Sequence, residues 1–191
     1  MSPVNLQSLD ELYHEVRECR NCDLWQSRDL AVPGEGPERA VVMLVGEAPG
    51  AKEDRTGLPF QGNAGRVFNK LLGIAGLRRE EVYVTGAVKC RPPKNRDPRA
   101  EEIDACNPYL RRQIDLVKPR IIVALGRFGL LAAMGRKEPI ARLRGRVLEH
   151  HGVSVIATYH PAAGFYREEL MRAMEEDMRR LGELVAAGAG E

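Results

Sequence analysis

The 191-residue sequence lacks the features that mark membrane-spanning, secreted and strongly basic proteins. It contains no run of about 18 apolar residues, so we expect no transmembrane helix and no membrane contact. Residues 1–7 lack the basic segment and apolar stretch of a secretion signal, which predicts a cytoplasmic protein. The net charge is only +2, so a DNA-binding surface would need local clusters of arginine and lysine.

Two common functional signatures are also missing. Neither G-x-x-x-x-G-K followed by Ser or Thr nor G-x-G-x-x-G occurs, which argues against a nucleotide-phosphate loop. The four histidines show no H-x-x-x-H spacing, so a metal-dependent hydrolase is not expected.

Hydrophobic residues make up 43% of the chain and charged residues 29%, which predicts one globular domain over residues 1–191. Short apolar or β-branched runs predict four buried strands, at 41–45, 82–88, 120–125 and 153–158. Apolar residues at helical spacing predict helices at 8–18, 64–76, 100–116, 127–135 and 167–187. This alternation predicts an α/β fold, a three-layer α/β/α sandwich with a central four-stranded, mostly parallel sheet. Its site should lie in the loops at the carboxyl ends of the strands.

Cysteine is scarce, and its spacing is informative. Cys19 and Cys22 form a C-x-x-C pair, and Cys90 and Cys106 follow much later in the chain. Four thiolates suit a closed structural site for zinc or for an iron–sulfur cluster. The second half of the set is split by 15 residues, unlike the paired C-x-x-C units of zinc ribbons, which favours a cluster. Four unrelated cysteines are the alternative, and disulfides are less expected without a secretion signal.

Two segments that follow predicted strands are candidates for a binding site. Residues 46–65 contain five glycines, which let backbone approach a flat or anionic ligand closely. Within this segment Phe60 is either a core residue or an exposed platform on which a base can stack. His160 follows the last predicted strand and precedes a proline, a position suited to a pocket, with a purely structural role as the alternative.

Several ordered motifs run through the chain. They are G-E-A-P-G-x-x-E-D-x-x-G-x-P-F-x-G-x-A-G at 46–65, V-K-C-R-P-P-x-N-R-x-P at 88–98 and Y-H-P-A-A at 159–163, together with the four cysteines. This combination resembles the family 4 uracil-DNA glycosylases of bacteria and archaea, and the resemblance covers about residues 19–167. It implies the uracil-glycosylase fold, a structural [4Fe-4S] cluster on Cys19, Cys22, Cys90 and Cys106, and uracil-containing DNA as substrate.

The resemblance also implies a reaction, hydrolysis of the N-glycosidic bond of a flipped uracil, which starts base excision repair and releases free uracil. His160 would donate a hydrogen bond to the uracil carbonyl oxygen as negative charge develops there. Phe60 would stack on the base, and Glu47 would orient or activate water, with Asp54 and Glu53 as second candidates. No lysine nucleophile and no strand-cleaving lyase activity are predicted. The residues expected to contact the base are Glu47, Ala48, Pro49, Glu53, Phe60, Gly86 and His160.

One position departs from the family pattern. Where the family has Thr-Asn ahead of V-K-C, this chain has Thr85-Gly86-Ala87. By family analogy the asparagine pairs with the Watson–Crick edge of uracil, and losing such a contact costs about 1–3 kcal/mol. The alternatives are therefore a broader glycosylase that also accepts hypoxanthine or xanthine, and a catalytically weakened DNA-binding relative. The G-A-V-K-C-R-P-P stretch is also similar to family 5 glycosylases, but Glu47 favours family 4.

Three segments are expected to contact DNA. They are the basic loop 91–99, the arginines around Gly145, and the loop after His160, which resembles a loop that fills the space left by a flipped base. We expect a monomer, and a replication sliding clamp is a candidate partner. The residues expected to contact DNA are Arg91, Lys94, Arg96, Arg144, Phe165 as the wedge, and Arg167.

Overall fold

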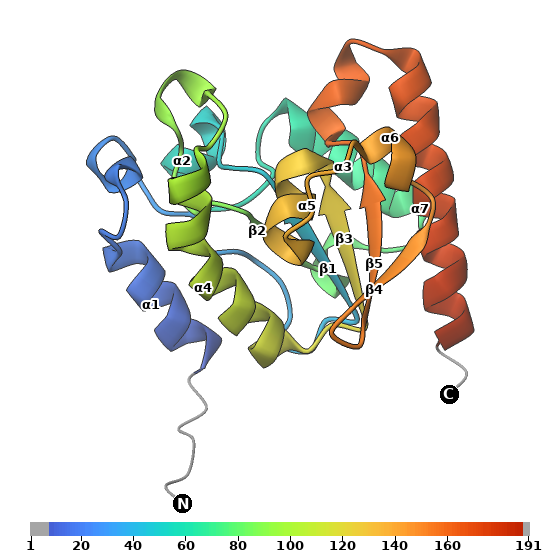
Figure 1. Ribbon diagram of the computed structural model, residues 1–191, viewed down its shortest axis with the longest axis horizontal. Coiled ribbons are helices and arrows are strands. Elements are labelled where there is room, and N and C mark those ends of the chain that lie inside the picture. Colours follow the sequence, from blue (N-terminus) through green and yellow to red (C-terminus); the bar gives the residue numbers. More distant parts are fainter. Residues whose placement is uncertain (1–7, 189–191) are drawn as a thin grey trace, which may run out of the picture.

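The computed structural model describes residues 8–188, which form a sheet flanked by helices (Figure 1). Segments 1–7 and 189–191 lie outside the described residues. The prediction that residues 1–7 carry no secretion signal and the two ends of the predicted 1–191 domain therefore fall outside them as well. No helix within residues 8–188 is long and apolar enough to cross a membrane.

The sheet has five strands in the order β2-β1-β3-β5-β4. β1 pairs in parallel with β2 and β3, β3 pairs in parallel with β5, and β4 is antiparallel to β5. The parallel strands therefore end at one edge of the sheet, and the arrowheads of β3 and β5 point to that upper edge in Figure 1. The strands are β1 (Val42–Gly46), β2 (Tyr83–Gly86), β3 (Ile121–Leu125), β4 (Val147–His150) and β5 (Val153–Thr158).

The sequence predicted four strands, and the sheet has five. The strand it missed, β4, lies at the edge of the sheet, and its residues alternate between exposed and half-buried positions. Because β4 has no fully buried residue, it lacks the apolar run by which the other four strands were recognised.

Five helices match the predicted positions to within about two residues, and two short ones, α2 and α6, were not predicted. A helix of four to six residues has too few turns to show a hydrophobic period. The helices are α1 (Leu9–Glu18), α2 (Ala51–Thr56), α3 (Asn63–Ile74), α4 (Ala100–Val117), α5 (Gly126–Met134), α6 (Ile140–Leu143) and α7 (Glu168–Gly188).

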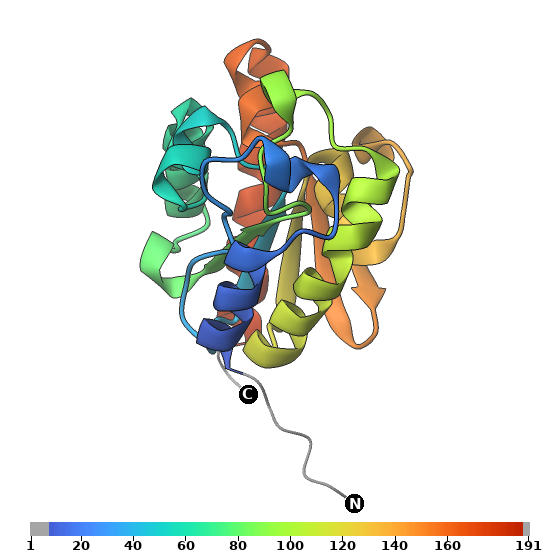
Figure 2. The ribbon, with the colours of Figure 1, turned by 90° about the vertical axis from the view of Figure 1, so that its left-hand side faces the viewer.

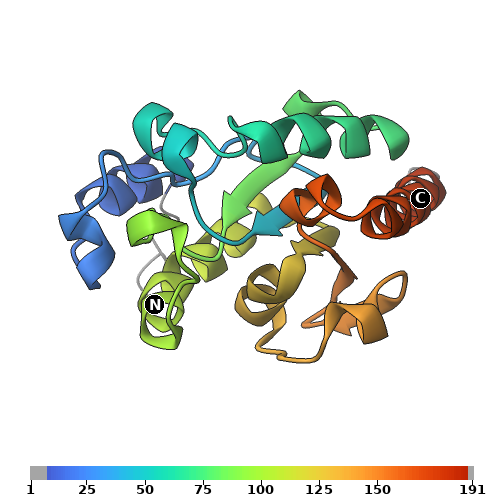
Figure 3. The same cartoon turned by 90° about the horizontal axis from the view of Figure 1, so that it is seen from above.

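Both faces of the sheet are covered, which gives the predicted three layers. Alternate residues of β1 enter opposite cores: Met43 and Val45 face the core with α1, α4 and α5, while Val42 and Leu44 face the core with α3 and α7. Figure 3 shows α3 on one side of the sheet and α4 and α5 on the other. A parallel strand buried on both faces reads as a continuous apolar run, which is why β1 could be predicted.

Helix α5 packs unusually close to β1, directly below the loop that carries Glu47. A Cβ on Gly129 would lie 2.2 Å from the Val45 carbonyl oxygen, so only glycine allows this approach. Gly73 in α3, by contrast, is exposed, and a Cβ added there would meet no neighbouring atom within 4 Å among the described residues.

We expect Gly129→Ala to lower the free energy of unfolding by about 1–3 kcal/mol, because α5 must move away from β1. The control Gly73→Ala should leave stability unchanged or raise it by about 0.5–1 kcal/mol, because alanine favours the helix interior. Urea unfolding followed by circular dichroism measures both. Equal stability of the two variants would contradict the close contact.

Candidate active site

The carboxyl edge of the sheet borders a cavity of about 490 Å³, a size typical of small-molecule sites. Its walls come from the loops after β1, β2 and β5, as expected for a parallel sheet. All seven residues expected to contact the base line this cavity, namely Glu47, Ala48, Pro49, Glu53, Phe60, Gly86 and His160.

Glu47 directly follows β1 and carries a perturbed carboxyl group. Burial and, to a smaller extent, the charge of Asp97 raise its pKa to about 7, against the opposing effect of Arg127. The carboxylate form is therefore available near neutral pH and can accept a proton from water there. This matches the requirement for a group that orients or activates water.

His160 also lines the cavity and lies just after β5. Burial lowers its pKa to about 4, against a smaller opposing effect of Glu53. The Ala162 backbone N–H donates to His160 Nδ1 at 3.3 Å, which requires Nδ1 to be unprotonated. The neutral ring then carries its proton on Nε2, so that His160 can donate one hydrogen bond without bearing a charge.

Phe60 contacts both the core and the cavity. Its ring stacks on Phe68 of the core with a centroid distance of 4.4 Å and an interplanar angle of 15°. The same ring lines the cavity and lies 5.9 Å from the His160 ring. Phe60 thus presents a flat, supported surface beside the histidine.

Glu53 organises the wall of the cavity. Its carboxylate accepts the N–H groups of Gly50 at 3.1 Å and of Gln61 and Gly62 at 2.7 Å each. Asp54 likewise accepts the backbone N–H of Asp29. Because these oxygens are engaged with backbone, Glu47 is better placed than either second candidate to act on water.

Gly86 leaves little room for a side chain. A Cβ there would lie 2.9 Å from the Val88 carbonyl oxygen and 3.4 Å from that of Glu47. An asparagine would therefore require the backbone of the neighbouring loop to shift. The Gly86 carbonyl itself accepts a hydrogen bond from Lys89 Nζ at 2.7 Å.

Lys89 was not identified as a functional residue from the sequence, yet it is fully buried between this cavity and the cysteines. Besides Gly86, its ammonium group donates to Thr85 and to the Gln113 amide oxygen at 2.8 Å. Burial lowers the pKa of Lys89 to about 8, while Cys106 and Cys90 raise it. Four polar side chains that line the cavity were also missed: Thr85 in β2, and Lys52, Asn63 and Asn95, which lie within the motif segments.

The six residues expected to contact DNA differ in how they are held. Lys94, Phe165 and Arg167 are exposed, as is Tyr166 beside the Phe165 ring. Arg91 donates to Asn95, and Arg96 pairs with Glu102 through both ends of its guanidinium group.

Arg144 is engaged within the protein. Its guanidinium group bonds to Glu176 at 2.9 Å, to Asp177 at 3.0 Å and to the Ala173 carbonyl oxygen at 2.6 Å. These contacts join α7 to the segment before β4, and the expected phosphate contact of Arg144 stays a prediction.

The four cysteines come together although they lie far apart in sequence. Cys19 ends α1, Cys22 precedes a short 3-10 helix (η1, Asp23–Gln26), Cys90 follows β2 and Cys106 lies in α4. Figure 2 shows α1 and α4 side by side, and all four residues line one small cavity. No group of three or more His, Cys, Asp or Glu among the described residues is arranged to hold a metal ion.

Hydrogen-bond donors lie close to two of the sulfur atoms, but burial disfavours the thiolate form and raises the pKa of Cys22, Cys90 and Cys106. Arg28 donates to Cys90 Sγ at 3.1 Å, and the Asn21 backbone N–H donates to Cys19 Sγ at 3.5 Å. Burial raises the pKa of Cys106 to about 12, although Lys89 lowers it. A buried thiolate here therefore needs a bound cation or cluster to be stable.

We expect the nitrogen NMR signals of His160 to show a neutral ring protonated on Nε2 at pH 7. Because its pKa is about 4 when folded and near 6.5 when unfolded, its contribution to stability is complete above pH 6.5. That contribution should fall as the pH drops towards 4, and His160→Gln should remove it from urea unfolding curves. Protonation near pH 6.5 in the folded protein would contradict the buried site.

Comparison with known proteins places these features in a family. A sequence model of the Uracil DNA glycosylase superfamily matches residues 33–181. The chain is 45% identical to the type-4 uracil-DNA glycosylase of Sulfurisphaera tokodaii over 94% of this chain and 86% of that protein. It is also 45% identical to the type-4 enzyme of Archaeoglobus fulgidus over 94% of both. A type-5 uracil-DNA glycosylase of Pyrobaculum aerophilum is 38% identical over 77% of this chain and 72% of that protein. The chain therefore belongs to the uracil-DNA glycosylase superfamily and, within it, to the type-4 uracil-DNA glycosylases.

Proposed function

We propose that this protein removes uracil from DNA by hydrolysing the N-glycosidic bond, the first step of base excision repair. The observation that carries the proposal is the meeting of Glu47 and Phe60, from the segment after β1, with His160, from the distant end of β5, around one cavity. The membership of the type-4 family supports the same activity.

Each of the three residues has a separate task. Phe60 stacks on the flipped base and holds it beside His160, whose Nε2–H donates a hydrogen bond to the carbonyl oxygen that gains charge as the bond breaks. Glu47 accepts a proton from the water that attacks the sugar. Hydrolysis by water needs no covalent intermediate, so we propose a monofunctional glycosylase.

Uracil is the proposed base, in spite of the missing asparagine. The close approach of the Val88 and Glu47 carbonyl oxygens to Gly86 means that backbone, not a side chain, borders this part of the cavity. Backbone groups can hydrogen-bond a base edge as side chains do. No observation favours hypoxanthine, xanthine or a non-catalytic DNA-binding role.

We propose that Cys19, Cys22, Cys90 and Cys106 hold a structural [4Fe-4S] cluster. A single zinc ion requires thiolates within about 3.8 Å of one another, from the Zn–S distance and tetrahedral geometry. The four cysteines share one cavity, and the split spacing of Cys90 and Cys106 suits a cluster better than a zinc ribbon. Arg28 and Lys89 supply positive charge and N–H donors around it.

The remaining proposals concern the setting of the enzyme. DNA as substrate and reduced cysteines as ligands favour the cytoplasm. Exposed Lys94, Phe165 and Arg167 are proposed to contact the DNA around the flipped nucleotide. A single domain over 1–191, a monomeric state and a sliding-clamp contact stay predictions.

Release of uracil from a labelled oligonucleotide under single-turnover conditions tests the activity. We expect the rate to rise about tenfold per pH unit up to about pH 7 and then to level off, because Glu47 must lose its proton. Glu47→Gln should lower the rate by about 10²–10⁴-fold and abolish this pH dependence.

Glu183→Gln, an equivalent change on the exposed face of α7, is the control and should keep the full rate. Oligonucleotides with cytosine, hypoxanthine or xanthine in place of uracil measure selectivity. The proposal fails if the unaltered protein releases no uracil, and the role of Glu47 fails if its pH dependence survives in Glu47→Gln.

Visible absorbance and iron content test the proposed cluster. Protein purified without oxygen should absorb visible light and contain about four iron atoms per chain. Cys106→Ser should lose iron and colour, whereas Ala105→Ser, beside the same cavity, should keep both. One zinc ion per chain and no visible absorbance would exclude the cluster.

A further inference from the structure

Phe60 adopts a backbone conformation that L-residues rarely occupy. Its φ is +51°, in the left-handed region. The turn is also tightly enclosed, because a Cβ on Gly65 would lie 1.9 Å from the Phe60 carbonyl oxygen. Contacts with other residues must therefore hold Phe60 in this conformation, because its backbone would otherwise relax to a negative φ.

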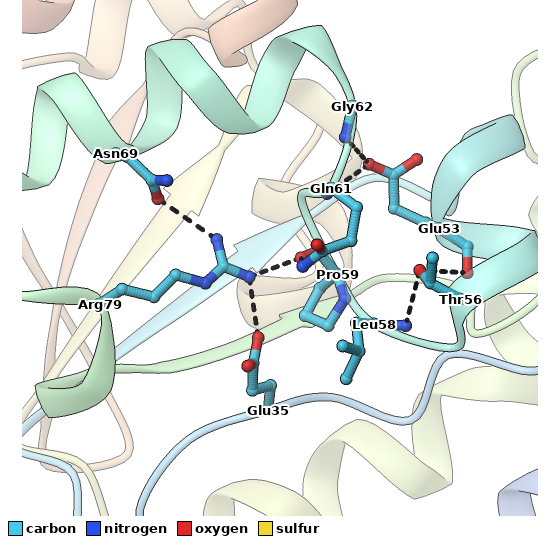
Figure 4. A network of polar contacts seen from close by, with 9 residues as sticks. All are labelled: Glu35, Glu53, Thr56, Leu58, Pro59, Gln61, Gly62, Asn69 and Arg79. Atoms are coloured by element: carbon cyan, nitrogen blue, oxygen red, sulfur yellow. Dashed lines mark hydrogen bonds and ion pairs between the residues drawn. The ribbon is translucent and has the colours of Figure 1, made fainter.

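Charged side chains form hydrogen bonds with the peptide groups on both sides of Phe60 (Figure 4). Arg79 donates to the Pro59 carbonyl oxygen at 2.5 Å, and Glu53 accepts the N–H of Gln61 at 2.7 Å. The orientations of these two peptide planes set φ and ψ of Phe60. Arg79 and Glu53 thus fix the residue between them from opposite ends.

Arg79 itself is tied to the edge of the sheet. It lies in a short 3-10 helix (η2, Arg79–Glu81) just before β2, and it bonds to Glu35 at 2.8 Å and to Asn69 at 3.4 Å. The backbone of Glu35 pairs with Val84 of β2 in both directions, at 2.9 and 2.7 Å. The carboxylate that orients Arg79 is therefore anchored on a rigid strand.

Arg79 supports the platform a second time through the rings. Its guanidinium group lies 5.4 Å from the centre of the Phe68 ring, on which Phe60 stacks. A cation over an aromatic face is attractive, and a planar guanidinium group can serve the ring, the carboxylate and the carbonyl at once. The ammonium group of lysine is not planar and cannot make these three contacts at once.

We propose that Arg79, oriented by Glu35, is a positioning residue that holds Phe60 in place to stack on the target base. Arg79 is not among the described residues that line the cavity, and its contact with the site runs through the Pro59 carbonyl, so it acts through Phe60. This inference rests on the proposed uracil-releasing function.

A double-mutant cycle tests the proposal. Phe60→Ala and Arg79→Met should each weaken inhibition by free uracil about fivefold or more, since stacking on an aromatic side chain contributes strongly to base binding. The double variant should be little worse than Phe60→Ala, because Arg79 has no platform left to position. Glu35→Gln and Arg79→Lys should give smaller losses in the same direction.

Arg78→Met is the matched control. Arg78 adjoins Arg79 but pairs with Glu80 and Glu81 at the surface, so uracil inhibition should be unchanged. Independent losses that multiply in the double variant would show a merely structural effect and overturn the proposal. Unchanged uracil inhibition in Arg79→Met would overturn it as well.

The proton NMR signals of His160 test the proposal without a measurement of uracil release. The Phe60 ring lies 5.9 Å from His160, so its ring current affects the His160 proton signals. Arg79→Met should shift these signals and Arg78→Met should not, and identical spectra for Arg79→Met and the unaltered protein would reject the positioning role. If the unaltered protein released no uracil, the proposed function would fail while this spectrum still tested Arg79.

Discussion

The parallel pairing of β1 between β2 and β3 is the constraint on which the site depends. Gly46 pairs with Gly86, and hydrogen bonds from Ala87 to Gly46 and from Val88 to Glu47 extend the ladder past both strand ends. The loops that follow β1 and β2 therefore start side by side. Both faces of β1 are buried, so a slip in its register would disrupt two cores at once.

Buried charged side chains then hold the loops and strand ends at this edge of the sheet in place. Glu53 binds three backbone N–H groups of the cavity wall, and Lys89 binds the Gly86 carbonyl from beneath. Asp177 accepts from Thr158 at the end of β5 and pairs with Arg144. Each of these charged groups is matched by partners, because an unpaired charge in a low-dielectric interior would be costly. The same exclusion of water raises the pKa of Glu47 and lowers that of His160.

Much of the fold was predictable because local patterns carried it. Ser8 and Glu11 form the capping box that begins α1, with Ser8 accepting from Glu11 at 3.2 Å, and buried Leu9, Leu12 and Val16 give the helix its apolar face. Strand β4 escaped prediction because an edge strand needs no buried run. The contacts of Arg144 within the protein were not predicted, because the sequence shows a basic cluster but not the acidic partners on α7 that bind it.

The sequence by itself determined the strands and long helices, the four-cysteine set and the motifs around Glu47, Phe60 and His160. These follow from periods, caps and spacings that span a few residues at a time. Only the tertiary structure decided the protonation of Glu47 and His160, the restricted space at Gly86 and the support of Phe60 by Arg79. Those properties arise from burial and from contacts between residues distant in sequence, which no local pattern contains.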